Sequence, residues 1–477
     1  MDSINHQRDH LASIISAITS ATDPYRILTE RLALESSKDL LTFDGSPVST
    51  GPNQTIEVKE AGKICVVGGG KAAAGFAAGL EHLLGRERLH KHEVHGLVSV
   101  PEGCGARLDH IEIRETRARA HNLPTDAVVQ ATHEMIHQLS TLKQEDLAFV
   151  LITGGASALL ESPRAHISLK SLVRLTKNLS HAGVDIQTLN TIRCMTSSVK
   201  AGGFAKVCTA GRLIVLVLSD VLDDSLEVIG SGPCIPHFVD PLAIERILLD
   251  SNISQDDRRL LSESIYEYVT KHNVAAHNQT LSSDWITSKG CRVTHLILGT
   301  NALAVEAASA ASSALGYEIF SATTNTLSQT ANTVGSRLAT SLGTMVSLGT
   351  TENRPQALLE GGEATVHVPL NHGVGGRNQH TVIAAAKDIL IDQKHEWPTD
   401  TLIASFGTDG EDGPTSAAGG FIDTDVAKSL VSQPNGIEDA MSRCDSHELL
   451  KSAGGLIETG PTGTNVADIR IVLTHPN

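Results

Sequence analysis

Short apolar runs recur along the chain, and most are followed by small or polar residues and then by helix-forming stretches rather than by hairpin turns. This alternation predicts strand–helix units around a largely parallel sheet, and therefore an α/β fold. Open α/β sheets bind ligands beyond the carboxyl ends of their strands, so we expect the chemistry in the loops after the runs. The runs span residues 63–70, 95–100, 148–155, 212–220, 295–300 and 401–410.

The length of 477 residues predicts two or three domains, because one domain usually contains about 100–200 residues. Over residues 232–260 the chain turns rich in proline and then in charged helix formers, which is typical of a boundary. We therefore expect two α/β domains, one over residues 1–240 and one over residues 241–477.

The formal net charge of −16 repels polyanions, so we expect neither nucleic acid nor an anionic membrane surface as a partner. No segment approaches the ~20 uninterrupted apolar residues of a membrane-spanning helix, and residues 1–18 lack the apolar core of a signal peptide. The seven cysteines are scattered and never form Cys-x-x-Cys, which favours a reducing compartment without a zinc site. We expect a cytoplasmic protein that binds small anions through locally placed cations.

The first apolar run ends in three glycines, Gly68, Gly69 and Gly70, followed by Lys71 and a helix former. The spacing satisfies the dinucleotide fingerprint G-x-G-x-x-[GA], but no acidic residue follows at the usual distance of about 20 residues, and the P-loop pattern is not met. Glycines allow a ligand to approach the backbone N–H groups, and a helix N-terminus and Lys71 add positive charge. We predict an anion site; the alternative is a tight turn with a solvated lysine.

Two further strand exits carry polar groups. Gly154, Gly155 and Ser157 follow the run at 148–155 and could present N–H donors and a hydroxyl, although the same residues are ordinary turn and N-cap chemistry. Asp220 follows the run at 212–220, where a carboxylate can orient a hydroxyl or a hydrated Mg²⁺, or simply cap a helix.

Arg193 and Lys200 are seven residues apart, which places both on one face if the segment is helical. Two cations on one face of an acidic protein can clamp an anion, whereas the plainer interpretation is a solvated helical face. We predict that both residues bind substrate.

Arg377 and Asn378 follow Gly375 and Gly376 and precede a helix-forming stretch. Arginine is unusual in such a turn, and its planar fork suits phosphate or carboxylate. This segment is predicted to bind an anionic cofactor.

Asp409 and Asp412 lie in the glycine-rich loop after the last run. Two carboxylates three residues apart can hold a divalent ion or place a general base, although Asp-Gly is also common in turns. We predict a metal site formed by both aspartates.

Other catalytic classes find no support in the sequence. The histidines at 90, 92 and 95 lie in a segment typical of an exposed connection, and no His-Glu-x-x-His zinc motif occurs. A Gly-x-Ser-x-Gly nucleophile elbow is absent too, which argues against serine hydrolase chemistry.

Taken together and in this order, the motifs resemble those of the class II glycerate 2-kinases, whose C-terminal portion is called the MOFRL domain. The resemblance extends from about residue 10 to about residue 473, with the MOFRL portion over about 355–473. It is carried by the segments VVGGGKAA, TGGASALL, NTIR, VKAGG, LSDVLDDSLEVIGSGP, GGEATV, GVGGRNQ, GTDGEDGPTSAAG and TGPTGTNV.

The resemblance implies a two-domain enzyme with a Rossmann-like, mostly parallel N-terminal sheet, a MOFRL-type C-terminal α/β domain and an active site in the cleft between them. The implied reaction is ATP- and Mg²⁺-dependent phosphorylation of D-glycerate at its 2-hydroxyl. Lys71 and Arg377 are the implied catalytic cations, Asp220 or Asp409 is expected on the metal or the acceptor hydroxyl, and Arg193 is expected near the substrate carboxylate with Ser157. A homodimer is left open.

Several residues depart from the family pattern. Ala156 stands where the family usually has glycine, Cys194 and Met195 stand where basic residues are expected, and His380 replaces a glutamate. Two other functions stay open at this point. The G-x-G-x-x-A match allows an NAD(P)-dependent hydroxypyruvate reductase, and Cys194, Met195 and His380 allow a weakly catalytic relative that binds sugar acids or nucleotides.

Overall fold

The computed structural model describes residues 2–35, 39–48, 55–118, 122–236, 240, 244, 253–271, 284–324, 329–352, 354–369 and 371–475. The chain divides into two compact units. The N-terminal unit contains Pro24–Leu218 and Asp224–Leu298, and the C-terminal unit contains Met1–Asp23, Ser219–Asp223 and Gly299–Asn477. The main division thus follows Leu298 rather than residue 240, because β10 (Arg292–Gly299) pairs within the sheet of the N-terminal unit.

A seven-stranded sheet in the order β6-β5-β4-β7-β8-β10-β9 forms the centre of the N-terminal unit. The β6–β5, β5–β4, β4–β7 and β7–β8 pairs are all parallel, which confirms the mostly parallel Rossmann-like sheet. Every residue of β4 and β7 is buried, as expected for parallel strands covered on both faces. The strands are β4 (Ile64–Gly69), β5 (His95–Pro101), β6 (Ile111–Arg117), β7 (Leu147–Ile152), β8 (Arg212–Leu218), β9 (Trp285–Ile286) and β10 (Arg292–Gly299).

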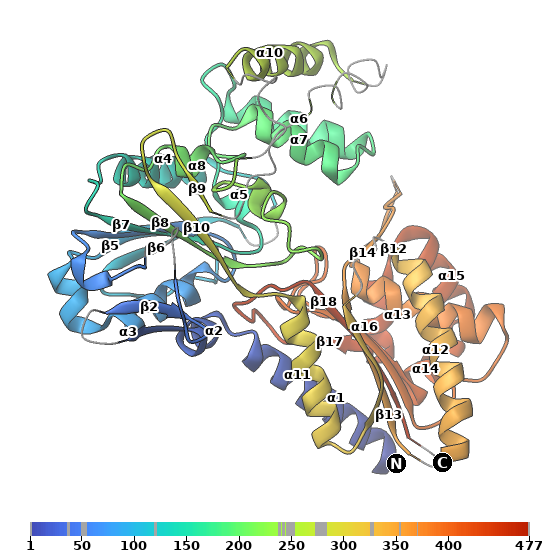
Figure 1. The fold of residues 1–477 in the computed structure, drawn as a ribbon. Helices are drawn as coiled ribbons and strands as arrows, with labels where there is room; N and C mark the ends of the chain where they lie inside the picture. The colour runs from blue at the N-terminus through green and yellow to red at the C-terminus, as the bar shows by residue number, and fades with distance from the viewer. Residues whose placement is uncertain are drawn as a thin grey trace. The chain divides into compact units, whose positions relative to one another are not determined.

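Helices and a small antiparallel sheet complete the N-terminal unit (Figure 1). The small sheet contains β1 (Leu32–Glu35), β2 (Leu40–Phe43) and β3 (Ser46–Pro47). The helices are α2 (Pro24–Arg31), α3 (Ala73–Lys91), α4 (Asp126–Ser140), α5 (Ala156–Leu159), α6 (Leu169–His181), α7 (Ile186–Thr196), α8 (Gly203–Lys206) and α10 (Gln255–Lys271), with 3₁₀ turns at Val58–Glu60 and Ile229–Ser231.

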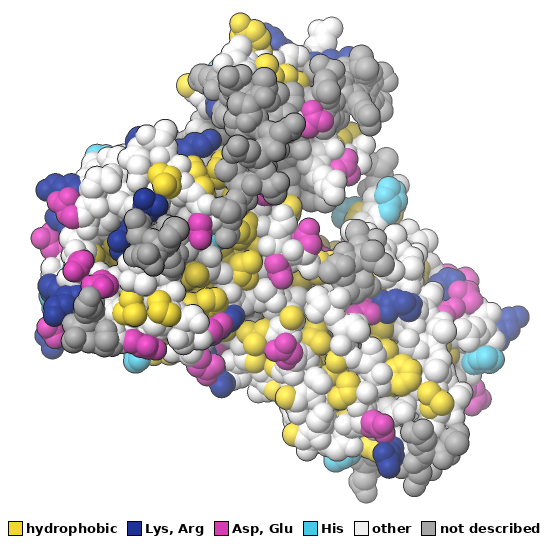
Figure 2. Space-filling view, viewed as in Figure 1, with side chains coloured by type: hydrophobic (Ala, Val, Ile, Leu, Met, Phe, Trp, Pro, Cys, Tyr) yellow, Lys and Arg dark blue, Asp and Glu magenta, His cyan; other side chains and the backbone are white. Residues whose placement is uncertain are grey.

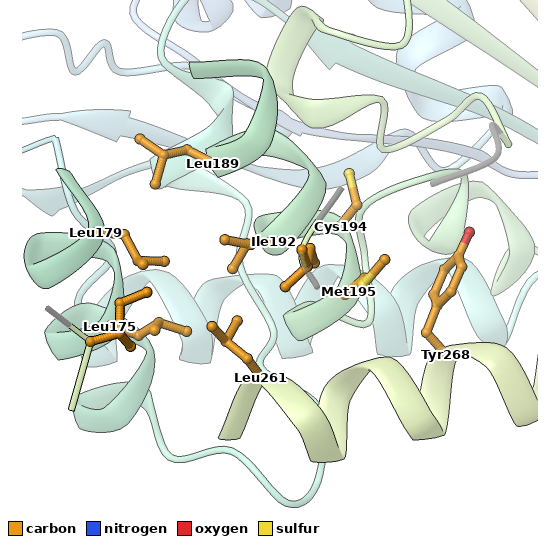
Figure 3. Close-up of a cluster of buried hydrophobic side chains, with 10 residues drawn as sticks. Leu175, Leu179, Leu189, Ile192, Cys194, Met195, Leu261 and Tyr268 are labelled. Carbon is orange, nitrogen blue, oxygen red and sulfur yellow. The ribbon is translucent and has the colours of Figure 1, made fainter. Parts of the chain in front are cut away.

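Helices α6, α7 and α10 pack around their own hydrophobic cluster (Figure 3). Cys194 and Met195 on α7 lie in this cluster, 1% and 0% exposed, beside Tyr268 of α10. A charged side chain at either position would be costly to bury. The apolar residues at 194 and 195 are therefore explained by packing within this cluster.

The C-terminal unit is built on a six-stranded mixed sheet in the order β11-β13-β18-β15-β16-β17. Only β11 and β13 pair in parallel; the other four pairs are antiparallel. The run at 401–410 thus forms a strand as predicted, but its neighbours are antiparallel. The strands are β11 (Glu318–Thr324), β13 (Gln356–Gly362), β15 (Thr401–Gly407), β16 (Gly419–Asp423), β17 (Leu456–Ile457) and β18 (Asp468–Thr474), and β12 (Gln329–Thr330) pairs with β14 (Ala364–Thr365) separately.

In this unit α1 runs beside α11 on one side of the sheet, and α12 lies beside α13 on the other (Figure 1). All residues of β13, β15 and β18 are buried between these layers. The helices are α1 (Asp2–Ala21), α11 (Asn301–Ala314), α12 (Ala331–Glu352), α13 (Arg377–Lys387), α14 (Thr424–Val431), α15 (Pro434–Arg443) and α16 (Ser446–Ala453), and Asp388–Asp392 continues α13 as a π-helix.

On the face shown in Figure 2, Lys and Arg side chains are interspersed with Asp and Glu side chains. Such mixing does not concentrate positive charge on that face, in keeping with the net charge of −16. Among the described helices, none combines the length and the apolar character needed to cross a bilayer.

The turns after β4 and β7 interlock. The N–H of Lys71 donates to the carbonyl of Gly154 at 2.8 Å, and the N–H of Ala72 donates to Thr153 Oγ1 at 3.1 Å. Gly70 has a φ of +138°, and a Cβ built there would lie only 2.0 Å from Thr153 Oγ1. The close approach of the two turns therefore requires glycine at this position.

Replacing Gly70 by alanine should force the two turns apart, because the added methyl overlaps both the hydroxyl and the backbone of Thr153. Gly183→Ala is the matched control, since Gly183 also has a positive φ, +75°, but has no atom within 4 Å of its built Cβ. We expect Gly70→Ala to lose about 1–3 kcal/mol more unfolding free energy than the control in urea titrations. Equal losses would show that the interlock does not need the missing side chain.

Candidate functional site

The β4 turn uses its own N–H groups to hold the fold. The N–H groups of Gly70, Lys71 and Ala72 donate to Ser99, Gly154 and Thr153 respectively. Gly68 and Gly69 lie within β4, and a Cβ on Gly68 would meet the backbone of Leu151 at 2.2 Å. The glycines predicted to bind cofactor through their backbone are thus required by packing.

The β7 turn has the complementary arrangement. Within the described part of the chain, the N–H groups of Gly154, Gly155 and Ser157 donate to no protein acceptor. Gly155 has a φ of +82°, and both Gly155 and Ser157 are partly exposed. The N–H of Ala156, which lies between them, donates to the Thr153 carbonyl at 3.0 Å, so Gly154 and Gly155 supply the two successive N–H groups of the kind that form an anion-binding concavity. The turn lies beside Lys71, whose Cγ lies 3.7 Å from a Cβ built on Gly155.

Arg117 is a further cation at this place that the sequence analysis missed. It ends β6, is only 4% exposed, and its Nη2 lies 3.5 Å from the Cβ position of Gly155. Its Nη1 donates to the carbonyl of Ala118 at 3.2 Å. Nothing in the charged strand sequence distinguishes Arg117 from its neighbours, because only the parallel order β6-β5-β4-β7 brings its end near the β7 turn.

Ser157 and Arg193, both predicted to bind substrate, are connected by two residues that were not predicted. Ser157 Oγ lies 2.9 Å from Ser231 Oγ, and Ser231 Oγ lies 3.4 Å from Asn190 Oδ1. Arg193 Nη1 donates to the same Asn190 oxygen at 3.1 Å. Both connecting residues lie within motifs singled out in the sequence. The contact of Asn190 with Arg193 is local, three residues apart on α7, whereas Ser231 reaches both Ser157 and Asn190 over long distances in sequence.

Lys200 does not share a helical face with Arg193, because α7 ends at Thr196. Its side chain is 1% exposed, and Nζ donates to the carbonyls of Ser157 at 2.8 Å and Leu160 at 3.1 Å. Nζ also pairs with Glu161 at 3.3 Å. The role predicted for Lys200 in binding substrate is corrected accordingly: the buried ammonium holds the segment that carries Ser157.

The guanidinium of Arg193 is largely removed from water. Removal from water lowers the pKa of its guanidinium, and Glu161 acts in the opposite direction. Glu161 is already paired with Lys200, and Arg193 forms no ion pair shorter than 4 Å with any described residue. A desolvated guanidinium without a carboxylate partner favours binding of an anion.

Arg377 is the first residue of α13, and two carboxylates hold its guanidinium. Nε and Nη2 donate to Asp468 at 2.7 and 2.9 Å, and Nη1 donates to Glu363. Burial alone would lower the pKa of Arg377, but Asp468 and Glu363 outweigh it and raise this pKa well above its ordinary value. Three of the five N–H groups are used, which leaves two for a ligand. Neither carboxylate was predicted.

Burial and neighbouring carboxylates disfavour the charged form of Glu363 in this cluster. Burial, Asp468 and Asp409 raise the pKa of the Glu363 carboxyl, while Arg377 lowers it. The single guanidinium thus balances more than one nearby carboxylate. Arg377, Asp468 and Glu363 together carry one net negative charge, so an incoming polyanion would need an accompanying cation here.

Asp412 is a helix cap in this structure. Its 1% exposed carboxylate accepts from the backbone N–H groups of Asn378 and Gln379 at 3.0 and 2.8 Å and from both of their side-chain amides at 3.3 and 3.0 Å. Burial raises the pKa of Asp412 to about 6 against the effect of these donors. With four donors on its two oxygens, Asp412 does not fit the predicted metal site.

The neighbouring residues that were predicted to bind cofactor, Gly375, Gly376 and Asn378, pack against protein atoms. Asn378 is 2% exposed, and its Oδ1 accepts from Ser405 Oγ at 2.5 Å. A Cβ on Gly376 would lie 2.2 Å from Asp412, and one on Gly375 would lie 2.3 Å from Ser446 Oγ. These three residues bring the N-terminus of α13 close to its cap, and their side chains contact protein.

Asp220 and Asp409 remain in positions compatible with ligand binding. Asp220 Oδ2 accepts from Asn465 Nδ2 at a long 3.5 Å, and Asp409 Oδ1 accepts from the N–H of Glu411 at 3.0 Å. Over the described residues, no three His, Cys, Asp or Glu side chains are grouped to hold a metal ion. Mg²⁺, however, often uses one or two protein carboxylates together with substrate phosphates.

His380 is a packing residue. It is 4% exposed on α13, its Nε2 lies 2.7 Å from Asn332 Oδ1 of α12, and burial lowers its pKa. A neutral imidazole that donates to an amide oxygen links the two helices. The histidine that replaces the family's glutamate at position 380 is therefore explained by the contact between α12 and α13.

Two family models match the chain: a domain of unknown function called DUF4147 matches residues 10–262, and the MOFRL family matches residues 356–468. Glycerate 2-kinase of Pyrococcus horikoshii is 32% identical over 96% of both chains. D-glycerate 2-kinase of Thermotoga maritima is 32% identical over 86% of this chain and 90% of its own. Human glycerate kinase is 31% identical over 86% of this chain and 84% of its own.

Solved structures agree with this relationship. The crystal structure of a Pyrococcus horikoshii protein has a TM-score of 0.71 at 30% identity and covers 98% of this chain and 99% of its own. The crystal structure of Thermotoga maritima glycerate kinase has a TM-score of 0.73 at 28% identity and covers 98% of this chain and 100% of its own. On the shared motifs, the shared fold and identities near 30% along almost its whole length, the chain belongs to the glycerate 2-kinase family that carries the MOFRL domain.

Proposed function

We propose that the chain is an ATP-dependent kinase that phosphorylates D-glycerate at its 2-hydroxyl. The observation that carries the proposal is the β7 turn, where the N–H groups of Gly154, Gly155 and Ser157 donate to no acceptor among the described residues and where Gly155 lies beside the side chain of Lys71. Relatives that match 86% to 96% of the chain are named glycerate kinases or glycerate 2-kinases. Phosphoryl transfer needs positioned donors and cations rather than a covalent nucleophile, and this turn supplies both.

The donor nucleotide is ATP in this proposal. The N–H groups of Gly154 and Gly155 bind its phosphates, and Lys71 neutralises charge on the phosphoryl group as it is transferred. Arg377 also neutralises charge on the transferred phosphoryl group, through the two N–H groups that do not donate to Asp468 or Glu363. Arg377 is well suited to this task because Asp468 fixes the plane of its fork.

The acceptor is a short hydroxy acid. Arg193 binds its carboxylate, since this guanidinium has lost water without gaining a carboxylate partner among the described residues. Ser157, on the same hydrogen-bonded chain, completes the acceptor site.

Asp409 and Asp220 are the carboxylates proposed for Mg²⁺ or for the acceptor hydroxyl. Bound Mg²⁺ would neutralise the triphosphate, which the net negative charge around Arg377 would otherwise repel. Asp409 contributes to the electrostatics of Glu363 and so belongs to that charge cluster. Asp412 is left out, because its oxygens already accept four hydrogen bonds.

The two other functions considered from the sequence lose their basis. A dinucleotide fingerprint binds pyrophosphate through the N–H groups of its turn, but those of Gly70, Lys71 and Ala72 donate to protein. A weakly catalytic relative was suggested by Cys194, Met195 and His380, and the packing described above accounts for all three.

The direct test is an assay of purified protein with ATP, Mg²⁺ and a panel of short hydroxy acids, in which ADP release is followed by a coupled reaction. We expect ADP release with D-glycerate and no oxidation of NADH or NADPH with hydroxypyruvate. Cofactor oxidation without ADP would support the reductase, and no reaction in either assay would support a binding protein.

Lys71→Ala should lower kcat by about 10²-fold or more, the scale of losing one preorganised charge contact. Lys63→Ala is the control: Lys63 precedes β4, and its Nζ forms an exposed ion pair with Glu93. Steady-state kinetics at saturating ATP and D-glycerate compare the two. A Lys71→Ala enzyme as fast as Lys63→Ala would remove Lys71 from the mechanism.

The two aspartates of the 409–412 loop should respond differently to substitution. Asp409→Asn should raise the Mg²⁺ concentration that gives half-maximal activity, because a carboxylate binds Mg²⁺ better than an amide. Asp412→Asn should leave that concentration unchanged and lower the unfolding free energy by about 1–3 kcal/mol, since its amide group faces donors that then lack acceptors.

Mg²⁺ titration of activity and urea unfolding of both variants check this pair of expectations. A large rise in the Mg²⁺ requirement of Asp412→Asn, at unchanged stability, would return Asp412 to the metal site.

A further inference from the structure

We infer that Ser231 is a positioning residue that makes the acceptor site selective for an acid with a 3-hydroxyl group. The inference rests on the proposed function, in which Arg193 binds the acceptor carboxylate. It adds a recognition step through Ser157 that distinguishes D-glycerate from its 3-deoxy analogue, D-lactate.

The backbone of Ser231 is held in an unfavourable conformation. Its φ is +64°, between Gly230 at +60° and Gly232 at +61°. Left-handed backbone disfavours any residue with a Cβ, and a glycine at 231 would adopt it freely. Strained residues of this kind are concentrated at functional sites. The presence of serine at 231 therefore points to a use for its hydroxyl.

The hydroxyl of Ser231 joins two parts of the acceptor site. Its Oγ contacts Ser157 Oγ at 2.9 Å and Asn190 Oδ1 at 3.4 Å. The backbone carbonyl of Ser231 accepts from the N–H of Ala201 at 3.2 Å and faces Cys194 Sγ at 3.7 Å. Ser231 is 1% exposed, so it acts on a ligand through Ser157 and Asn190.

The direction of the hydrogen bonds follows from the chemistry of the groups. An amide oxygen can only accept, so Asn190 Oδ1 accepts from both Arg193 and the hydroxyl of Ser231. Having donated its proton to Asn190, Ser231 accepts from the hydroxyl of Ser157. Ser157 Oγ then keeps both of its lone pairs, so it can accept a hydrogen bond from a ligand but has no proton left to donate to one.

A hydroxyl group of the acceptor is the donor that fits. The carboxylate is taken by Arg193, and the 2-hydroxyl is the group phosphorylated in the proposed reaction. The 3-hydroxyl of D-glycerate remains, and it can donate to Ser157 Oγ. D-Lactate has a methyl group in its place, which would leave the Ser157 acceptor without a partner.

The test is the ratio of kcat/KM for D-glycerate to kcat/KM for D-lactate in wild type, Ser231→Ala, Ser231→Gly and Ser157→Ala. Wild type should prefer D-glycerate by at least about tenfold, the scale of one hydrogen bond. Each variant should reduce that preference several-fold while KM for ATP stays the same. A loss of general stability would slow both substrates alike and leave the ratio intact.

Ser231→Gly distinguishes loss of the hydroxyl group from loss of stability. Glycine removes the hydroxyl group but also relieves the strain of the left-handed backbone at this position. It should lose selectivity as Ser231→Ala does, with a melting temperature no lower than that of Ser231→Ala. A wild-type enzyme that uses both acids equally, or an unchanged ratio in the Ser231 variants, would overturn the inference and leave the kinase proposal standing. Absence of D-glycerate phosphorylation by wild type would overturn both.

Discussion

The contact between the turns after β4 and β7 is the constraint on which the rest of the candidate site depends. The Lys71 N–H to Gly154 and the Ala72 N–H to Thr153 bonds fix the two turns against each other. They use the N–H groups of the first turn, whereas those of Gly154, Gly155 and Ser157 in the second turn donate to no acceptor in the part of the chain that the structure describes. One turn thus contributes a cationic side chain, and the other contributes backbone donors.

Both units use a buried charge to position an accessible cation or hydroxyl. In the N-terminal unit the ammonium of Lys200 binds the carbonyls of the segment that carries Ser157. In the C-terminal unit the carboxylate of Asp412 caps the helix that begins with Arg377. Each buried charge is satisfied by several hydrogen bonds, which is the condition under which burial is tolerated. In each unit a buried charged group thus holds the backbone that carries a proposed site residue, Ser157 in one unit and Arg377 in the other.

Part of this arrangement could be predicted from local sequence, and part could not. All six apolar runs form strands, because continuous burial selects apolar residues locally. Arg377 stood out because an arginine is rare after a glycine turn, and the structure places it at a helix N-terminus between carboxylates. Asp468 and Ser231 could not be predicted to matter, because their contacts with Arg377 and Ser157 span many tens of residues and depend on the fold. Asn190 and Glu363 lie nearer in sequence to the arginines they contact, but nothing local marks an amide or a carboxylate as an arginine partner. Asp412 and Lys200 were misassigned for a related reason: a charged residue near a glycine turn has the same local sequence whether it binds a ligand or caps the fold.

The central claim is that this site transfers a phosphoryl group from ATP to the 2-hydroxyl of D-glycerate. The most direct measurement is the proton-coupled ³¹P NMR spectrum of the product, since a phosphate on C2 couples to one proton and a phosphate on C3 couples to two. The account predicts a doublet that grows with ADP and coincides with added 2-phosphoglycerate. A triplet, or inorganic phosphate with no phosphate ester, would contradict it.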